Sequence, residues 1–318
     1  MDSQHLTRSL SIIIPARNEA QSLRTLLPAL RQLLPEAEII VVNDGSSDST
    51  SAVCRECSVN EIKHQYGIGN GAAVKTGVRA ATGDLLLLMD GDGQHDPRDI
   101  PRLLQKLAEG YDMVVGARTP DSQASIGRSW ANRLYNRVAS WMTNHHIPDL
   151  TSGFRLARAD RFREFLHLLP NGFSYPTTVT MAFFRAGYSV AYVPIRAASR
   201  IGRSHIRPLQ DGTRFLLIIF KIGTLYSPLK LFLPVSAAFF VTGLSYYVFT
   251  YVTQGRFTNM SALMFTTSVV VFLIGLVSEQ ITQLIYQPIR DRVPASFGRG
   301  EAESQPQERS SKVRKIGA

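Results

Sequence analysis

Residues 85–97, LLLLMDGDGQHDP, decide the fold class, because an apolar run ends here in a cluster of acids. The four leucines are typical of a short buried strand, and Asp90 and Asp92 come just after them. Carboxylates this close together repel one another unless they are solvated or paired. The pattern therefore predicts a strand that presents an acidic loop to a cation.

Three further apolar runs predict the sheet to which this strand belongs. They are SIIIPA at 11–16, EIIVVND at 38–44 and MVVGAR at 113–118. Continuous apolar strands between helical stretches indicate an α/β fold with a mostly parallel, Rossmann-like sheet covered on both faces. Ligands of such sheets bind outside the carboxyl ends of the strands, so we expect Glu19, Asp44 and Asp90 to converge there.

The acidic loop fits a divalent cation, but it does not fit an EF-hand calcium loop. With Asp90, Asp92 and Gln94 at positions 1, 3 and 5, His95 stands where glycine is required and Pro101 where the bidentate glutamate belongs. A few oxygen donors on one loop suit Mg²⁺ or Mn²⁺, which share their coordination with substrate phosphates. The alternative is that these aspartates only cap a turn before the next helix.

A glycine-rich segment, GIGNGAAVKTG at 67–77, invites comparison with dinucleotide-binding loops. Its glycines at 67, 69 and 71 lack the G-x-G-x-x-G spacing, and no strong strand precedes them. The segment is therefore weak evidence for a dinucleotide cofactor. A loop that opens a helix near a phosphate remains an open interpretation.

The C-terminal third predicts a membrane hairpin. Residues 231–252 and 257–278 contain no charged residue, and each stretch is long enough to cross a hydrocarbon core of about 30 Å. The alternative is a pair of buried helices in a soluble protein. Basic residues flank the two stretches, and only Arg256 lies between them. Because basic residues favour the cytoplasmic side, this asymmetry predicts that the N-terminal part and the tail lie in the cytoplasm and the hairpin in the cytoplasmic membrane. The net charge of +10 is then largely explained by the membrane, so we expect no nucleic-acid partner.

These patterns predict four parts of the chain. They are a cytoplasmic catalytic domain at 1–206, an interfacial amphipathic helix at 207–230, a two-helix membrane hairpin at 231–289 with spans near 231–252 and 257–280, and a basic, disordered tail at 290–318.

Four segments in fixed order resemble glycosyltransferase family 2, whose enzymes have the GT-A fold. The segments are SIIIPARNEA, VVNDGSSDST, GNGAAVKTG and DGDGQHDP. The later DLTSGFRL, RIGRSHI and the membrane hairpin make the chain similar to dolichol-phosphate mannose synthases and bacterial polyprenyl-phosphate glycosyltransferases. The resemblance covers about 9–289, and Leu150 stands where the family usually has proline. It implies transfer of a hexose from a GDP- or UDP-sugar to a polyprenyl phosphate.

The resemblance also implies roles for individual residues. Donor binding would involve Pro15, Arg17, Glu19, Asp44, Asp90 and Arg200. The divalent cation would be held by Asp92 and Gln94, and catalysis would depend on Asp90, Asp92 and Arg118. The acceptor phosphate would be contacted by Arg118, Arg128, Asn132, Ser152, Arg155, Ser204 and His205.

Elementary chemistry agrees with this assignment. A nucleoside diphosphate gains negative charge as it leaves, and a cation with an arginine stabilises that charge. A lipid phosphate oxygen is already anionic near neutral pH, so it can attack without a strong base, and we expect inversion at the anomeric carbon. Asp149 is either a base or a supporting partner.

Two other functions stay open at this point. A processive polysaccharide synthase would usually carry Q-x-x-R-W, whereas residues 210–215 read QDGTRF. A non-catalytic, membrane-bound nucleotide-sugar-binding protein would keep the same fold without turnover. The sequence indicates neither the sugar nor the base, and it leaves a homo-oligomer open.

Overall fold

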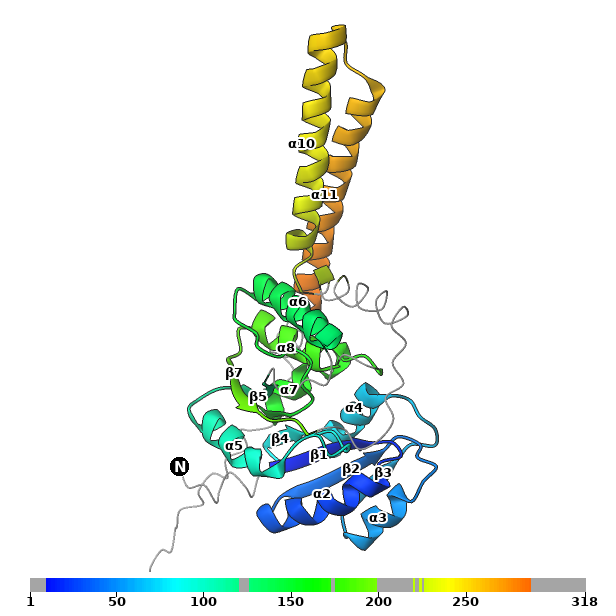
Figure 1. The fold of residues 1–318 in the computed structure, drawn as a ribbon, viewed down its shortest axis with the longest axis vertical. Helices are drawn as coiled ribbons and strands as arrows, with labels where there is room; N and C mark the ends of the chain where they lie inside the picture. Colours follow the sequence, from blue (N-terminus) through cyan, green and yellow to red (C-terminus); the bar gives the residue numbers. More distant parts are fainter. Residues whose placement is uncertain are drawn as a thin grey trace, which may run out of the picture. The chain divides into compact units, whose positions relative to one another are not determined.

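The computed structural model describes residues 10–119, 126–172, 175–198, 220, 223–224 and 226–286. Seven strands form one sheet in the order β3-β2-β1-β4-β6-β5-β7 (Figure 1). The strands are β1 (Leu10–Ala16), β2 (Glu38–Asn43), β3 (Asn60–Lys63), β4 (Leu85–Leu88), β5 (Met113–Arg118), β6 (Arg155–Arg158) and β7 (Val190–Ile195). The predicted α/β fold with a mostly parallel sheet is confirmed, and we call residues 10–198 the sheet domain.

One strand runs against the others. β6 is antiparallel to both of its neighbours, β4 and β5, while the remaining strand pairs are parallel. Leu88 at the end of β4 lies opposite Arg155 at the start of β6. The turn that precedes β6 therefore lies at the same edge of the sheet as the loop that follows β4.

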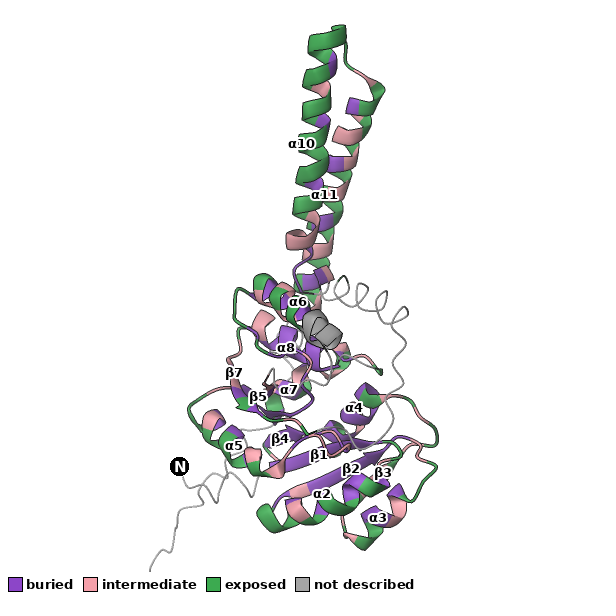
Figure 2. Cartoon of the chain, viewed as in Figure 1, coloured by how far each residue is buried: buried purple, intermediate pink, exposed green. Residues whose placement is uncertain are grey.

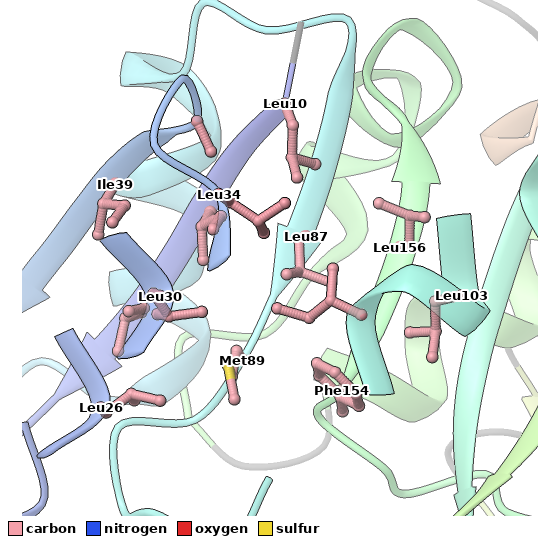
Figure 3. Packing of buried hydrophobic residues seen from close by; sticks show 14 of the residues in the cluster. Leu10, Leu26, Leu30, Leu34, Ile39, Leu87, Met89, Leu103, Phe154 and Leu156 are labelled. Atoms are coloured by element: carbon pink, nitrogen blue, oxygen red, sulfur yellow. The ribbon is translucent and has the colours of Figure 1, made fainter. Parts of the chain in front are cut away.

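Different helices cover the two faces of the sheet. One face carries α2 (Ala20–Leu33), α3 (Thr50–Glu56) and α5 (Ile100–Ala108); the other carries α4 (Asn70–Ala80), α7 (Ala159–Glu164) and α8 (Tyr175–Arg185). Ile12 and Ile14 of β1 pack into the first cluster and Ile13 into the second, as strand alternation requires. Figure 3 shows part of the first cluster, where Leu30 and Leu103 lie around Leu87.

The remaining elements of the sheet domain are short helices and one long helix. They are η1 (Pro97–Asp99), α6 (Ile126–Thr143) and η3 (Leu166–Leu168). The Asp96 side chain accepts a hydrogen bond from the Arg98 backbone N–H and so caps η1.

Two long apolar helices follow, α10 (Pro228–Gln254) and α11 (Asn259–Ile285), and we call them the hairpin. Each has 27 residues, about 40 Å at 1.5 Å per residue. Their length and composition are sufficient to cross a membrane. Gly255 ends α10 with a φ of 64°, and Thr258 caps α11. The predicted pair of apolar helices is confirmed, and it fits association with a membrane.

Small residues hold the two helices of the hairpin together. The buried positions are Ser236, Gly243 and Thr250 in α10, besides its first residue, and Ser261, Ser268, Gly275 and Thr282 in α11. Their seven-residue spacing keeps one side of each helix against the other. The Ser236 hydroxyl donates to the Ser268 carbonyl oxygen and the Ser268 hydroxyl to that of Ser236, each at 2.9 Å. Figure 2 shows the outer surfaces of both helices exposed.

Part of the predicted organisation lies outside the described residues. The predicted tail at 290–318 and most of the predicted interfacial segment at 207–230 belong to this part. The last three residues of that segment, from Pro228 to Lys230, belong to α10.

Candidate functional site

The loops after β1 and β2 are tied to one another at the carboxyl edge of the sheet. Asn18, in the left-handed region at a φ of 57°, accepts a hydrogen bond from the Ser47 N–H at 2.8 Å. Its own N–H donates to the Ser46 hydroxyl at 2.9 Å. The Ala20 N–H, at the start of α2, donates to Asp48 at 3.1 Å. The segments SIIIPARNEA and VVNDGSSDST, far apart in sequence, thus form one surface, as the strand pattern predicted.

Asp44 is buried and organises the loop that leads into α4. Its carboxylate accepts hydrogen bonds from His64 Nδ1 and from the backbone N–H groups of Ile68 and Gly69, each at 2.8 Å. Burial alone would raise the pKa of Asp44, but these hydrogen bonds outweigh burial and hold the pKa below its usual range. The carboxylate therefore fixes residues 64–69, and its predicted contact with the nucleotide base stays a prediction.

The glycines of the 67–77 segment allow close packing. A Cβ at Gly67 would lie 2.5 Å from Arg17 Nη1, and one at Gly69 would lie 2.6 Å from the Asn171 carbonyl oxygen. The Ala72 N–H, in the first turn of α4, donates to the same Asn171 oxygen at 2.9 Å. This donor of the α4 N-terminus is occupied by protein, so at Gly69 the missing side chain serves the close approach of Asn171.

The acidic loop, residues 89–96, lies directly against the turn that precedes β6. A Cβ at Gly153 would overlap Asp90 Oδ2, so a larger residue there would displace the Asp90 carboxylate. Asp92 accepts a hydrogen bond from the Gln94 N–H at 3.1 Å, and Gln94 Nε2 donates to the Ala198 carbonyl oxygen at 3.4 Å. The structure thus brings Asp90 to the turn before β6 and the predicted metal ligand Gln94 to the segment after β7.

A cation at this loop would need ligand oxygens from elsewhere. Among the residues that the structure describes, no group of three or more His, Cys, Asp or Glu side chains could by itself hold a metal ion. The available donors are carboxylates and one amide oxygen, which are the ligands of Mg²⁺ and Mn²⁺. The donor set therefore fits a divalent ion whose remaining positions are filled by the oxygens of a phosphorylated ligand.

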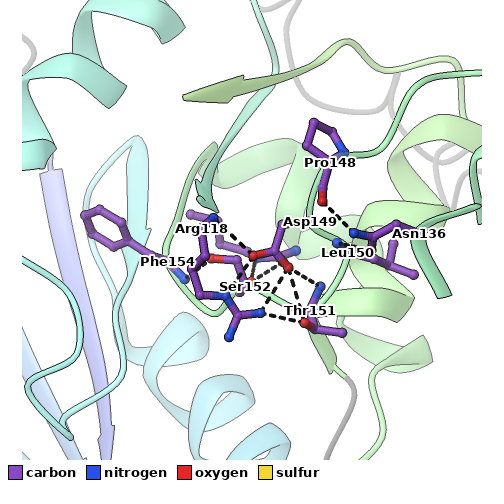
Figure 4. A network of polar contacts seen from close by, with 9 residues as sticks. Arg118, Asn136, Pro148, Asp149, Leu150, Thr151, Ser152 and Phe154 are labelled. Atoms are coloured by element: carbon purple, nitrogen blue, oxygen red, sulfur yellow. Dashed lines mark hydrogen bonds and ion pairs between the residues drawn. The ribbon is translucent and has the colours of Figure 1, made fainter. Parts of the chain in front are cut away.

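Arg118, the last residue of β5, forms a two-point ion pair with Asp149 (Figure 4). The Arg118 Nε–Asp149 Oδ2 and Nη2–Oδ1 distances are 2.8 and 3.0 Å, and Nη2 also donates to Thr151 Oγ1 at 2.6 Å. Burial would lower the pKa of Arg118, but Asp149, together with the charges of Asp90 and Asp92, raises it. Arg118 is thus a cation held in place by Asp149 that interacts electrostatically with Asp90 and Asp92 of the acidic loop.

The same pair answers the question left open for Asp149. Burial would raise the pKa of Asp149, but hydrogen bonds from Arg118 and the charge of Arg118 lower it below the usual range. Both carboxylate oxygens accept hydrogen bonds from Arg118. This arrangement favours Asp149 as the partner that orients Arg118 over Asp149 as a base.

Arg155 and Ser152 lie inside the protein. The Arg155 side chain is fully buried; Nη1 donates to the Pro176 carbonyl oxygen at 2.8 Å and to Thr180 Oγ1 at 3.0 Å, and Nε donates to the Ser152 carbonyl oxygen at 3.2 Å. The Ser152 hydroxyl accepts from the Phe154 N–H at 3.3 Å. The predicted contact of Arg155 with an acceptor phosphate is not favoured here, because its guanidinium faces protein carbonyls. Both residues hold the turn before β6.

Comparisons with known proteins indicate the family of the chain. Residues 11–166 match the model of Glycosyl transferase family 2, and residues 227–284 match that of the GtrB C-terminal hairpin. Undecaprenyl-phosphate mannosyltransferase of Micrococcus luteus is 32% identical over 207 residues, which is 59% of this chain and 83% of the relative. The chain belongs to glycosyltransferase family 2. The resemblance seen in the sequence is confirmed, and the protein is an enzyme of that family.

Two further proteins are similar to this glycosyltransferase, one in sequence and one in fold. Glycosyltransferase AglJ of Haloferax volcanii is 27% identical over 243 residues, covering 74% of this chain and 79% of that protein. Glucosyl-3-phosphoglycerate synthase from Mycobacterium tuberculosis, solved with Mn²⁺, uridine diphosphate and glucosyl-3-phosphoglycerate, superimposes with a TM-score of 0.55. It is 19% identical, and the match covers 69% of this chain and 80% of the other. This likeness shows a common fold.

The other predicted site residues of the glycosyltransferase divide into three groups. Pro15 is buried in β1, and Glu19 precedes α2, its N–H donating to Thr50 Oγ1 at 3.3 Å. Arg128 and Asn132 belong to α6, but their side chains are not described. Arg200, Ser204 and His205 lie outside the described residues.

Two aromatic side chains beside the site were not predicted. Tyr175, fully buried at the start of α8, donates from its hydroxyl to the Gly153 carbonyl oxygen at 3.4 Å. His95 is buried and stacks on Phe154, with ring centroids 5.0 Å apart. Tyr175 lies 85 residues beyond Asp90, and no spacing in the sequence signals their proximity. His95 belongs to the acidic loop, but its stacking partner Phe154 lies in the turn before β6, so the sequence around His95 does not reveal this contact.

Proposed function

We propose that this glycosyltransferase transfers a hexose from a nucleotide sugar to a polyprenyl phosphate at the cytoplasmic surface of a membrane. The name of the Micrococcus luteus relative supports the lipid phosphate acceptor. The hairpin supports an acceptor held in a membrane, since both helices are long and apolar enough to span one. The basic residues that flank the hairpin support a cytoplasmic sheet domain and tail.

The observation that carries the proposal is the position of the acidic loop beside Arg118. Asp90 and Asp92 lie at the carboxyl edge of a parallel sheet, where such folds bind ligands, and their charges act on Arg118. A bound divalent ion, held by Asp92 and Gln94, would neutralise charge on a diphosphate. A solved neighbour of the same fold contains Mn²⁺ with uridine diphosphate, which supports Mn²⁺ or Mg²⁺ and leaves UDP or GDP as donor.

The proposed reaction needs no proton transfer at the attacking atom. An anionic oxygen of the lipid phosphate forms the new bond to the anomeric carbon as the bond to the donor phosphate breaks. The nucleoside diphosphate leaves with the bonding electron pair, and the configuration inverts. Arg118, held in place by two bonds to Asp149, would offset the repulsion between the two phosphates.

The remaining assignments complete this proposal. The donor would lie against the surface formed by Pro15, Arg17, Glu19 and Asp44, whose loops are tied together by Asn18 and Asp48. The acceptor phosphate would meet Arg118 together with Arg128 and Asn132 of α6 and with Ser204 and His205, and Arg200 would contact the donor diphosphate.

The test supplies membranes containing the full chain with undecaprenyl phosphate and labelled GDP-mannose or UDP-glucose, in Mg²⁺ or Mn²⁺. We expect a labelled, chloroform-extractable product that a chelator abolishes. Asp92→Asn should lower its rate about a hundredfold to a thousandfold, because charge on the leaving group is no longer stabilised. Asp96→Asn is the control, since this half-buried carboxylate pairs with Arg98 and caps η1. A long polymer, or no labelled lipid with any donor, would refute the proposal.

A further inference from the structure

Each helix of the hairpin carries one charged residue, and both residues contact the sheet domain. Lys230 is the single charge of α10, and Glu279 that of α11. Lys230 Nζ donates to the Met142 carbonyl oxygen at 3.0 Å and to Asn144 Oδ1 at 3.3 Å. Glu279 Oε1 accepts from Arg185 Nη2 at 2.9 Å. A charge in an apolar helix is costly unless it is paired, so these contacts call for an explanation.

Glu279 joins three helices at one point. Its Oε1 pairs with Arg185 at the end of α8, and its Oε2 accepts from the Leu229 N–H, in the first turn of α10, at 3.3 Å. The Arg185 and Glu279 side chains are each only 17% exposed. Arg185 also donates to the Tyr226 carbonyl oxygen and lies 5.8 Å from the ring centroids of Tyr226 and Tyr286. The pair is therefore enclosed rather than a solvated surface contact.

The other end of α8 lies at the candidate site. Arg155 donates to Pro176 and Thr180 in the first two turns of α8, and Tyr175 bonds to Gly153, which lies against Asp90. The eleven residues of α8 span about 16 Å. This helix thus connects the acidic loop to the hairpin through packed, hydrogen-bonded contacts at both ends.

We propose that Arg185 and Glu279 are positioning residues that set the acidic loop relative to an acceptor held in the membrane. Neither residue reaches the candidate site, so the pair acts through α8. The proposal rests on the lipid acceptor proposed above. It predicts a defect that depends on how the acceptor is delivered: an acceptor dissolved in water can approach the site freely, whereas a membrane-held phosphate needs the site at a fixed position.

The experiment compares two acceptors with the full chain in lipid nanodiscs. One is undecaprenyl phosphate in the nanodisc, and the other is a short, water-soluble prenyl phosphate. Glu279→Gln removes the charge but keeps an oxygen that can accept from Leu229. We expect it to lower kcat/KM for the membrane-held acceptor on the order of tenfold or more, because small misplacements of reacting groups are costly. With the soluble acceptor the variant should stay within about twofold of the natural chain.

Two further variants sharpen the test. Arg185→Gln should give the same pattern, and the double variant should lose no more than either single one, as expected when two residues act through one contact. Glu164→Gln is the matched control, because this carboxylate pairs with Arg161 and Tyr188 within the sheet domain. It should leave both acceptors unaffected.

The outcomes are separable. Equal losses with both acceptors, or no loss with either, would overturn the positioning role while leaving the transferase intact. Additive losses in the double variant would overturn it as well. If the natural chain glycosylates neither prenyl phosphate, the proposed function fails, and the positioning role fails with it.

Discussion

The sheet domain and the hairpin are both rich in apolar residues, yet they bury opposite kinds of side chain. In the sheet domain Ile12, Leu87 and Phe154 are wholly buried. In the hairpin the buried positions are small, and large side chains such as Phe249 and Val277 are about three-fifths exposed, at 60% and 59%. Figure 2 shows this contrast along the chain.

The difference follows from what surrounds each part. In water, burying a large apolar side chain contributes about 1.5–3 kcal/mol, so the sheet domain gathers such residues inside. Lipid tails solvate large side chains as well as a protein interior does, so helices in a membrane gain little by burying them. Small residues instead let the helices approach closely. The burial pattern of the hairpin therefore supports a lipid environment more directly than its composition does.

The largest expected difference is in the free energy of unfolding when one leucine of each region is changed to alanine. Leu87→Ala removes a wholly buried side chain from β4 and should lower the free energy of unfolding by about 2–5 kcal/mol, since a cavity remains. Leu273→Ala, at a position in α11 that is 51% exposed, is the matched control and should change it by less than about 0.5 kcal/mol. Urea unfolding of the full chain in detergent measures both. Similar costs at the two positions would show that the hairpin surface is packed against protein.

A second pair of variants tests whether the close contact between Gly153 and Asp90 is needed for sugar transfer rather than for the stability of the fold. Gly153→Ala pushes a Cβ into the Asp90 carboxylate and should slow sugar transfer about a hundredfold, because the acidic loop must shift. Gly172→Ala is the control, because a Cβ there would meet no atom within 4 Å. Initial rates measure the effect, and unfolding midpoints check the fold. Full activity of Gly153→Ala would mean that the position of Asp90 does not matter.

The smallest effect is expected inside the hairpin. A Cβ at Gly275 would lie 2.8 Å from that of Phe232, so Gly275→Leu should force the helices apart at a cost on the order of 1 kcal/mol. To measure this, Ser236→Cys and Ser268→Cys are introduced at two positions that face one another. Gly275→Leu should lower the yield of the disulfide between these two cysteines. Val277→Leu, at an exposed position, should leave the yield unchanged. An unchanged yield with Gly275→Leu would refute packing through small residues.

The features that the sequence reveals are those carried by local pattern. Apolar runs predicted β1, β2, β4 and β5, because a strand buried on both faces has apolar residues at nearly every position. The acidic loop was recognisable because Asp90 and Asp92 follow such a run directly. Two uncharged stretches predicted the hairpin, although α10 extends a few residues beyond its stretch at both ends, and α11 begins two residues after the start of its stretch and ends seven residues beyond it.

Features that depend on distant partners were not predictable in this way. β6, RLAR, places two arginines in four residues and has no apolar run, and its pairing is decided by β4 and β5. The resemblance implied that Arg155 contacts the acceptor phosphate, and its hydrogen bonds to Pro176 and Thr180 could not be foreseen from the sequence. The Arg185–Glu279 pair spans 94 positions, and no spacing rule connects them.

The reversed direction of β6 has a consequence for how such enzymes diversify. A parallel strand delivers to the ligand edge only the segment that follows it, whereas a reversed strand delivers the segment that precedes it. Residues 119–154, between β5 and β6, therefore leave from and return to the same edge, like an insert with both ends anchored. In the proposed function this insert supplies the acceptor contacts Arg128 and Asn132, so a designer who keeps Asp149 and Gly153 can exchange the rest of it as a cassette to change what receives the sugar.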